Sequence, residues 1–314
     1  MNPLNFYMKW KTSVIAREDG GRFSGTVAGS FALFNFFKFN AISPFSNLEE
    51  SSILSQAVPK ESDLFKRLDH WKLFIYECWT TLTNEFKSTK TLVFSGDHSG
   101  SAGIFSAFRQ ATGDAKIGVL WIDAHADLHT PYTSPSLNPH GMPVGAILNL
   151  DAKHLKRRDL SPEIIELWNE IKFATGFLSP EDIFFLGLRS VEKEEAKLIR
   201  ELDLECVPAH DINLLDIDGL ANKIVDFFDG YDAIYISFDI DALDSYYVPG
   251  TGTPVPSGLT PEFMVELFDL ILPKLPVRIF EITEYNPLLD VQGKTLNTII
   301  EILKPLGRHF EASA

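Results

Sequence analysis

The sequence predicts a single α/β domain in which a central parallel β-sheet is covered by helices on both faces. Short apolar runs rich in β-branched and aromatic residues alternate with polar or amphipathic stretches that are long enough for helices. Strands of this kind are buried on both faces, as in parallel sheets with helical crossovers. No linker rich in proline and glycine separates two such units. We therefore expect one domain over residues 1–314.

The expected elements become clearer along the chain. Residues 19–30 are rich in glycine and serine and indicate a loop, and residues 41–62 indicate a polar connection. Residues 63–87 carry apolar positions at helical spacing and predict an amphipathic helix. Strands are expected next at 91–94, 116–122, 182–188, 204–209, 231–238 and 277–282. Helices are expected between them, among others at 161–173, 191–202 and 217–229.

The composition limits the kinds of partner. Asp and Glu outnumber Lys and Arg by 43 to 28, which gives a formal charge of −15. Such a surface repels phosphate backbones and attracts small cations, so we expect no nucleic-acid partner. No apolar run approaches the ~20 residues that span a bilayer, so we expect no membrane partner. Cys78 and Cys206 form no disulfide framework, which predicts a cytoplasmic protein.

Acids and imidazoles cluster at the ends of four expected strands. The segments SGDHS, DAHADLHT, DIDALD and EITEYNP each come where one apolar run ends. In open α/β sheets, ligands bind in the crevice at the carboxyl ends of the strands. We therefore expect these side chains to meet at one edge of the sheet.

The spacing inside these segments favours a metal site. Residues two apart on extended backbone point to the same side, so Asp123, His125 and Asp127 can face one way. Carboxylates crowded into one crevice repel one another, and two divalent cations would offset their charge. Carboxylate and imidazole ligands without thiolate favour manganese or another fairly hard ion. Taken singly, DAHAD could be a charged loop with helix caps, and DIDALD a calcium loop or a solvated turn.

Together these motifs resemble those of the ureohydrolase family of arginases, agmatinases and formimidoylglutamases. The matching segments are 95–99, 123–130, 133–145, 237–260 and 281–287, and the likeness covers roughly residues 90 to 310. Residues 1–90 match poorly and lack the family's usual opening strand. The resemblance implies a three-layer αβα, arginase-like fold, two Mn²⁺ ions per subunit, and a homo-oligomer, either a trimer or a hexamer.

The resemblance also implies which residues bind the metals. One ion would bind His98, Asp123, Asp127 and Asp239, and the other His125, Asp123, Asp239 and Asp241. Asp123 and Asp239 would bridge the two ions.

Catalysis follows from this implied site. A water shared by two metal ions has a lowered pKa and, as hydroxide, can attack a guanidinium carbon to release urea and an amine. His140 would protonate the leaving amine. Glu284 would pair with the guanidinium, which suits bidentate contact with a carboxylate. Asp127 would be the third catalytic residue.

The loop DLHTPYTSPSLNPHGMP resembles arginases more than agmatinases, which implies L-arginine as the substrate. Ser136 and Asn138 would hold the substrate carboxylate. The remaining substrate-binding candidates are His129, Glu192, Glu195, Thr253 and Glu284.

Other functions remain open on the sequence. His129 replaces an Asn of the arginases and Glu192 replaces an Asp, so formimidoylglutamate or another guanidino acid is the alternative substrate. Agmatine comes behind these because it has no carboxylate for the loop to hold. The alternative without catalysis is a silent scaffold, which the retention of all ligand positions, His140 and Glu284 argues against. A phosphoesterase would need a Lys/Arg cluster near the metal motifs, which the sequence lacks.

Overall fold

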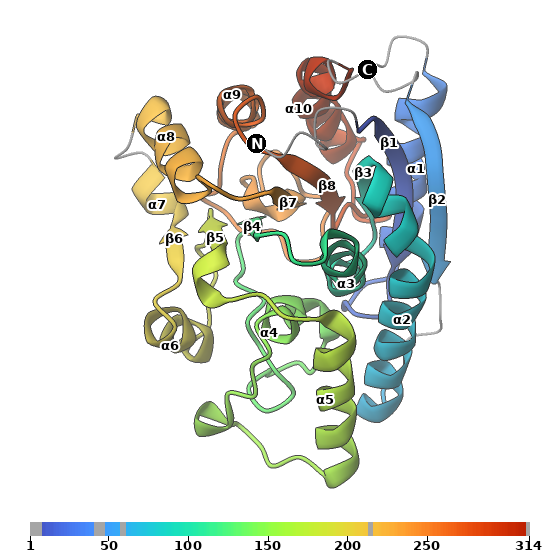
Figure 1. The fold of residues 1–314 in the computed structure, drawn as a ribbon, viewed down its shortest axis with the longest axis vertical. Coiled ribbons are helices and arrows are strands. Elements are labelled where there is room, and N and C mark those ends of the chain that lie inside the picture. The colour runs from blue at the N-terminus through green and yellow to red at the C-terminus, as the bar shows by residue number, and fades with distance from the viewer. Residues whose placement is uncertain (1–7, 41–47, 57–60, 213–215, 312–314) are drawn as a thin grey trace.

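A parallel sheet of eight strands crosses the described part of the chain (Figure 1). The computed structural model describes residues 8–40, 48–56, 61–212 and 216–311. The strand order is β2-β1-β3-β8-β7-β4-β5-β6, and every neighbouring pair is parallel. The strands are β1 (Trp10–Arg17), β2 (Glu49–Gln56), β3 (Lys90–Ser95), β4 (Ile117–Ile122), β5 (Ile183–Leu186), β6 (Glu205–Val207), β7 (Ala233–Asp239) and β8 (Val277–Thr283).

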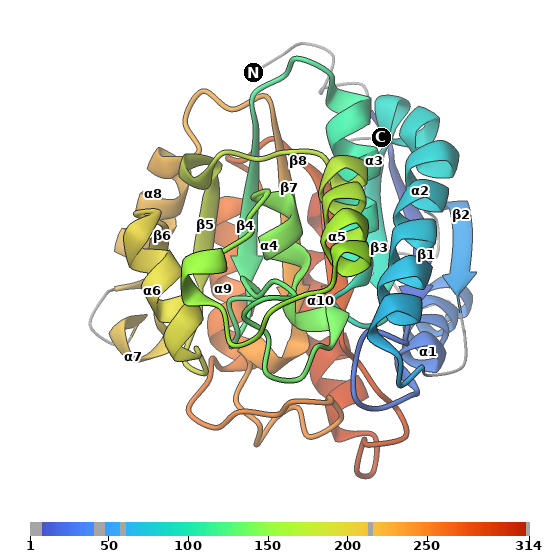
Figure 2. The same ribbon diagram turned by 90° about the horizontal axis from the view of Figure 1, so that it is seen from below.

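Helices cover both faces of this sheet, as Figures 1 and 2 show. One layer holds α1 (Thr26–Phe39), α8 (Ile217–Phe227), α9 (Pro261–Ile271) and α10 (Lys294–Glu311). The opposite layer holds α2 (Leu64–Ser88), α3 (Gly100–Thr112), α4 (Pro143–Ile147) and α5 (Pro162–Thr175). Two shorter helices, α6 (Lys193–Glu201) and α7 (Ala209–Ile212), follow β5 and β6. In β4, Leu120 and Ile122 pack in the first core and Val119 and Trp121 in the second, because side chains alternate along a strand. The arrangement confirms the predicted three-layer αβα class.

Side-chain caps mark where several helices begin. The Asp63 carboxylate accepts the Lys66 amide at 3.0 Å before α2. Ser161 and Thr260 cap α5 and α9 in the same way, and each is followed by a proline whose missing N–H costs nothing in the first turn. Within the described ranges, no helix is long and apolar enough to cross a membrane.

The expected helix and strands after residue 63 are confirmed, but two expectations for the earlier residues were wrong. Helix α1 begins at Thr26, inside the expected loop 19–30, and strand β2 lies inside the expected connection 41–62. Strand β2 pairs on one side with β1 and is the edge of the sheet, so its sequence EESSILSQ is not the apolar run of a buried strand. Residues 41–47 and 57–60 of that connection lie outside the described residues. The expectation that residues 1–90 lack an opening strand was also wrong, because β1 lies there and pairs with both β2 and β3.

The strand order brings four expected ligand segments together. Strands β7 and β8 come late in the chain but lie between β3 and β4 in the sheet. Strands β3, β8, β7 and β4 are therefore neighbours, and their carboxyl ends share one edge because all are parallel. Such points, where the strand order reverses, form ligand crevices in open α/β sheets.

Candidate metal centre

Each of the four central strands delivers a polar side chain to this edge. His98 lies in the turn after β3, Asp123 follows β4, Asp239 ends β7 and Glu284 follows β8, and all four are buried. The backbone is left-handed at Asp127 and Glu284, with φ of 51° and 67°. Residues other than glycine seldom adopt this conformation, and where they do so the strain is concentrated at functional sites.

His98 stands at the middle of three carboxylates. Its Nδ1 lies 3.1 Å from oxygens of Asp123 and Asp127 and 3.2 Å from an oxygen of Asp239. Its Nε2 lies 2.9 Å from the Ser237 hydroxyl oxygen, and that hydroxyl donates to a carboxylate further inside the fold. Nε2–H of His98 therefore donates to Ser237, and Nδ1 is the ring nitrogen that faces the acids.

His125 and Asp241 extend the cluster. Nδ1 of His125 lies 3.4 Å from Oδ1 of Asp123 and 3.1 Å from Oδ2 of Asp241. Asp239 accepts the Asp241 amide at 2.8 Å, and the Thr253 hydroxyl donates to Asp241 at 2.9 Å. These hydrogen bonds hold the turn after β7 so that both of its acids face the cluster.

Burial and mutual repulsion disfavour the ionised forms of the acids in this cluster. Burial, Asp241 and Asp123 together raise the pKa of Asp239 well above its ordinary value. Burial and Asp123 raise the pKa of Asp127 to about 6. Burial disfavours a charged His98, but the acids around it outweigh burial and raise its pKa well above the ordinary value. The acids can all ionise only beside cations.

The donor set fits two divalent cations. Two groups, His98–Asp123–Asp239 and Asp123–His125–Asp241, each have ligand atoms within 4.8 Å of one another. Asp123 belongs to both groups. Nδ1 of His98 is buried, has no hydrogen-bond partner of good geometry among the described residues and faces oxygens of three acids, which is the setting of a metal-binding nitrogen. Imidazole nitrogen and carboxylate oxygen together suit an ion such as manganese.

A second histidine–carboxylate pair lies beside the cluster. His140 is in the short 3₁₀ turn Pro139–Gly141, and its Nδ1 lies 3.3 Å from Oε1 of Glu284. Burial opposes both charges. Glu284 nevertheless raises the pKa of His140, and His140 lowers the pKa of Glu284. The contact therefore favours a protonated His140 beside an ionised Glu284.

A cavity of about 210 Å³ opens over these groups. Most of the predicted site residues line it: His98, His125, Asp127, His129, Ser136, His140, Glu192, Glu195, Asp239, Thr253 and Glu284. We call His129, Ser136, Glu192 and Glu195 the head-group region. Asn138 is not among the lining residues, and its Oδ1 accepts a hydrogen bond from Nη1 of Arg67 at 2.8 Å.

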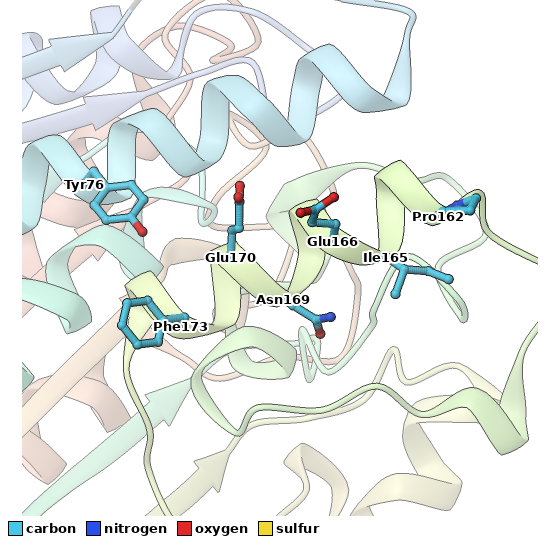
Figure 3. A pocket seen from close by; sticks show the side chains of 7 residues that line it. All are labelled: Tyr76, Pro162, Ile165, Glu166, Asn169, Glu170 and Phe173. Atoms are coloured by element: carbon cyan, nitrogen blue, oxygen red, sulfur yellow. The ribbon is translucent and has the colours of Figure 1, made fainter.

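A separate surface hollow of about 530 Å³ lies between α2 and α5 (Figure 3). Tyr76 of α2 and Phe173 of α5 lie at one end of it, and Glu166 and Glu170 of α5 lie between them and Pro162. None of its lining residues is a predicted site residue. The chemistry therefore lies in the cavity at the sheet edge.

Comparison with known proteins shows the family to which this chain belongs. The model of the arginase family matches residues 70–306. The chain belongs to the arginase family.

Arginase from Entamoeba histolytica is 30% identical over 227 residues, which cover 71% of this chain and 72% of that protein. Arginase from Bacillus subtilis is 31% identical over 220 residues, 68% of each chain. The crystal structure of the Entamoeba histolytica arginase in complex with L-ornithine superposes with a TM-score of 0.79 at 24% identity, over 96% of this chain and 99% of that one. The fold and the sequence together make the protein an arginase-family hydrolase.

Two arginines that the sequence motifs did not single out contact predicted site residues. Arg157 pairs with Glu192 and Glu194, and Arg67 donates to Asn138. Both contacts arise from tertiary packing, so no local spacing could have identified these arginines. Ser237, by contrast, stands two residues before Asp239 in SFDID, where the alternation of a strand places both side chains on one side.

Proposed function

We propose that this arginase-family protein is a manganese-dependent hydrolase that converts L-arginine and water to L-ornithine and urea. The observation that carries the proposal is the pair of overlapping histidine–aspartate groups beside His140 and Glu284 in one cavity. The relatives named arginase favour a guanidino substrate.

Six side chains would hold two Mn²⁺ ions. His98, Asp123, Asp127 and Asp239 would hold one ion, and His125, Asp123, Asp239 and Asp241 the other. Shared use of Asp123 is supported by its place in both ligand groups. When bound, such an ion pair lowers the pKa of water at the site and thereby makes hydroxide available at neutral pH.

Glu284 would bind the guanidinium of the substrate. Its carboxylate is buried, and it stays ionised because His140 lowers its pKa and the His98 amide donates to Oε1 at 2.9 Å. A guanidinium presents a planar fork of N–H groups that pairs well with a carboxylate. Glu284 would thus orient the guanidinium carbon toward the metal cluster.

His140 would supply the proton for the leaving amine. Its Nδ1 is engaged by Glu284, so Nε2 is the nitrogen that can pass a proton to the δ-nitrogen of the substrate. Glu284 raises the pKa of His140, which favours the protonated imidazole that this step requires. The His140 amide donates to the Gly20 carbonyl at 3.2 Å, which fixes the turn that carries the imidazole.

The head-group region would hold the amino-acid end of the substrate. His129 is buried and its Nε2 has no hydrogen-bond partner among the described residues, so it can contact a carboxylate. Ser136 offers a hydroxyl, and Glu192 and Glu195 offer carboxyl groups for an ammonium. Asn138 does not line the cavity, and its Oδ1 accepts a hydrogen bond from Arg67. Its side chain would therefore have to rotate in order to contact the substrate carboxylate.

We further propose that the protein works in the cytoplasm as a homo-oligomer, a trimer or a hexamer. The two unpaired cysteines support a reducing compartment. Light scattering of the purified protein gives the number of chains.

Product analysis tests the substrate. Manganese-loaded protein is offered L-arginine, formimidoyl-L-glutamate and agmatine in parallel, and ornithine, urea, formamide and putrescine are quantified. Ornithine and urea in equal amounts from arginine, at the highest kcat/KM of the three, are the expected result. Preferred turnover of formimidoylglutamate or agmatine would overturn the arginine assignment and keep the hydrolase. Turnover of none of the three by metal-loaded protein would overturn the arginine assignment and leave another guanidino acid or the silent scaffold.

A further inference from the structure

Arg157 holds the carboxylate of Glu192 at the rim of the cavity. Its Nη2 lies 2.8 Å from Oε2 of Glu192 and 2.6 Å from Oε2 of Glu194. The Arg157 amide donates to the Tyr132 carbonyl at 2.9 Å, so the backbone is anchored too. The Glu194 side chain is only 6% exposed, whereas that of Glu192 is 42% exposed. The guanidinium is thus tied to a buried acid and reaches an acid that lines the cavity.

Glu192 is the carboxylate in the head-group region best placed for a substrate ammonium. Both oxygens of Glu195 already accept backbone N–H groups, from Leu128 and from Glu192, each at 3.1 Å. Oε2 of Glu192 is the same atom that Arg157 contacts. A substrate ammonium that approached Glu192 would therefore meet the positive charge of a guanidinium that is already bound to the same carboxylate.

His129 offers the opposite chemistry in the same region. Its Nδ1 lies 3.1 Å from the Thr133 hydroxyl oxygen. That oxygen accepts the Thr130 amide at 3.0 Å, and Nδ1 is closer to the hydroxyl than the Thr130 carbonyl at 3.5 Å, so the hydroxyl hydrogen goes to Nδ1. The ring proton then sits on Nε2, which is buried and lies 3.8 Å from Oε2 of Glu192 and 3.7 Å from Oε2 of Glu195, beyond hydrogen-bond distance of both. The head-group region thus presents a donor that a substrate carboxylate can use and, in Glu192, an acid that is already paired with Arg157.

We propose that Arg157 is a specificity-determining residue, and that its pairing with Glu192 makes the α-ammonium of the substrate nearly dispensable. The substrate class is then the ω-guanidino carboxylic acids, with or without an α-amino group. This inference rests on the proposed function, because it concerns the head group of the same substrate.

Two ligands that differ only in the α-ammonium test the inference. L-Ornithine and 5-aminopentanoate are titrated by calorimetry into manganese-loaded protein, and the ratio of the two Kd values is compared among variants. Arg157→Gln removes the charge and Arg157→Lys keeps it. Lys156→Gln is the matched control, because Lys156 is the neighbouring cation but pairs with the exposed Asp159. Circular dichroism checks that each variant is folded.

The wild type is expected to bind L-ornithine less than about fivefold more tightly than 5-aminopentanoate. Arg157→Gln should raise this preference by about two- to fivefold, the range of partly exposed ion pairs, while Arg157→Lys and Lys156→Gln leave it unchanged. An unchanged or reduced preference in Arg157→Gln would overturn the inference, as would a large preference in the wild type or binding of neither ligand. Because these are binding measurements, a failure of the proposed reaction appears separately, as absence of urea from arginine.

Discussion

Nδ1 of His140 lies 3.3 Å from Oε1 of Glu284, and this contact joins the turn after β4 to the end of β8. Each residue stabilises the charged form of the other despite burial, which raises the pKa of His140 and lowers that of Glu284. In the proposed reaction, this one contact would prepare a proton donor and a guanidinium acceptor together.

His140→Asn should lower kcat by about 10²- to 10⁴-fold, because the leaving amine loses its general acid. Manganese affinity should stay within about twofold, since His140 is in neither ligand group. Steady-state kinetics with L-arginine and metal titration measure the two effects. His154→Asn is the control, because His154 pairs with Glu201 at the surface. A His140→Asn enzyme with normal kcat would remove His140 from the mechanism.

Ser237→Ala should weaken manganese binding by about 10- to 100-fold. The Ser237 hydroxyl accepts the Nε2–H of His98, and partners of this kind orient metal-binding imidazoles. Ser101→Ala is a matched control, because Ser101 donates to the same carboxylate of Glu281 without touching His98. Metal titration of the wild type and of both variants measures the manganese affinity of each. Equal losses in both variants would mean that Glu281, rather than the contact with His98, sets the affinity.

The metal-free protein should lose stability as the pH rises through about 8. Burial raises the pKa of Glu195 from 4.5 to about 8. A carboxyl group whose folded-state pKa is raised binds its proton more tightly when folded, so its stabilising effect is complete below pH 4.5 and is lost on the way to pH 8. The loss is on the order of 3–5 kcal/mol for a shift of this size.

Glu195→Gln tests this prediction. The amide cannot accept both backbone N–H groups, so the variant should be less stable at every pH, but its stability should fall less between pH 5 and 9. Urea unfolding of chelated protein over this range gives the two slopes. Parallel curves for wild type and variant would show that Glu195 does not carry the pH dependence.

Arg67→Met should raise the KM for L-arginine by about tenfold and change kcat much less. Arg67 donates to Asn138, which with Ser136 belongs to the loop proposed to hold the substrate carboxylate, and a hydrogen bond from a charged donor is worth about 1.5–3 kcal/mol. Lys66→Met serves as the control, because Lys66 is the neighbouring side chain on α2 and pairs with Glu61. If kcat falls and KM does not change, Arg67 supports His140 rather than the substrate loop.

The meeting of these acids and imidazoles at one edge of the sheet could be predicted, because each polar segment follows a buried strand. Asp123 comes right after IGVLWI and Asp239 ends AIYISFD, so apolar run and acid are adjacent in the sequence. The strand order, which brings β7 and β8 between β3 and β4, was not predicted from the sequence. The expected strands after residue 63, and the helices expected at 63–87, 161–173, 191–202 and 217–229, could be predicted because their apolar patterns show which side chains are buried.

The rest depends on contacts that local patterns do not contain. Strand β2 is an edge strand held by backbone pairing with β1. Its polar sequence lacks the apolar run by which the buried strands could be recognised. The pairing of Arg157 with Glu192 joins residues 35 positions apart, and that of Arg67 with Asn138 joins residues 71 apart. Asn138 was expected to hold the substrate carboxylate, yet it does not line the cavity, because nothing in the sequence shows that Arg67 lies beside it.

The proposed function requires that two manganese ions in this cluster enable hydrolysis of a guanidino group. The most direct measurement is urea release from L-arginine by metal-free protein as manganese is added stepwise. Activity should rise from zero and level off at two equivalents per chain, and Asp123→Ala, which lacks the residue common to both ligand groups, should stay inactive. Urea release without metal, or no urea at any manganese concentration, would contradict the account.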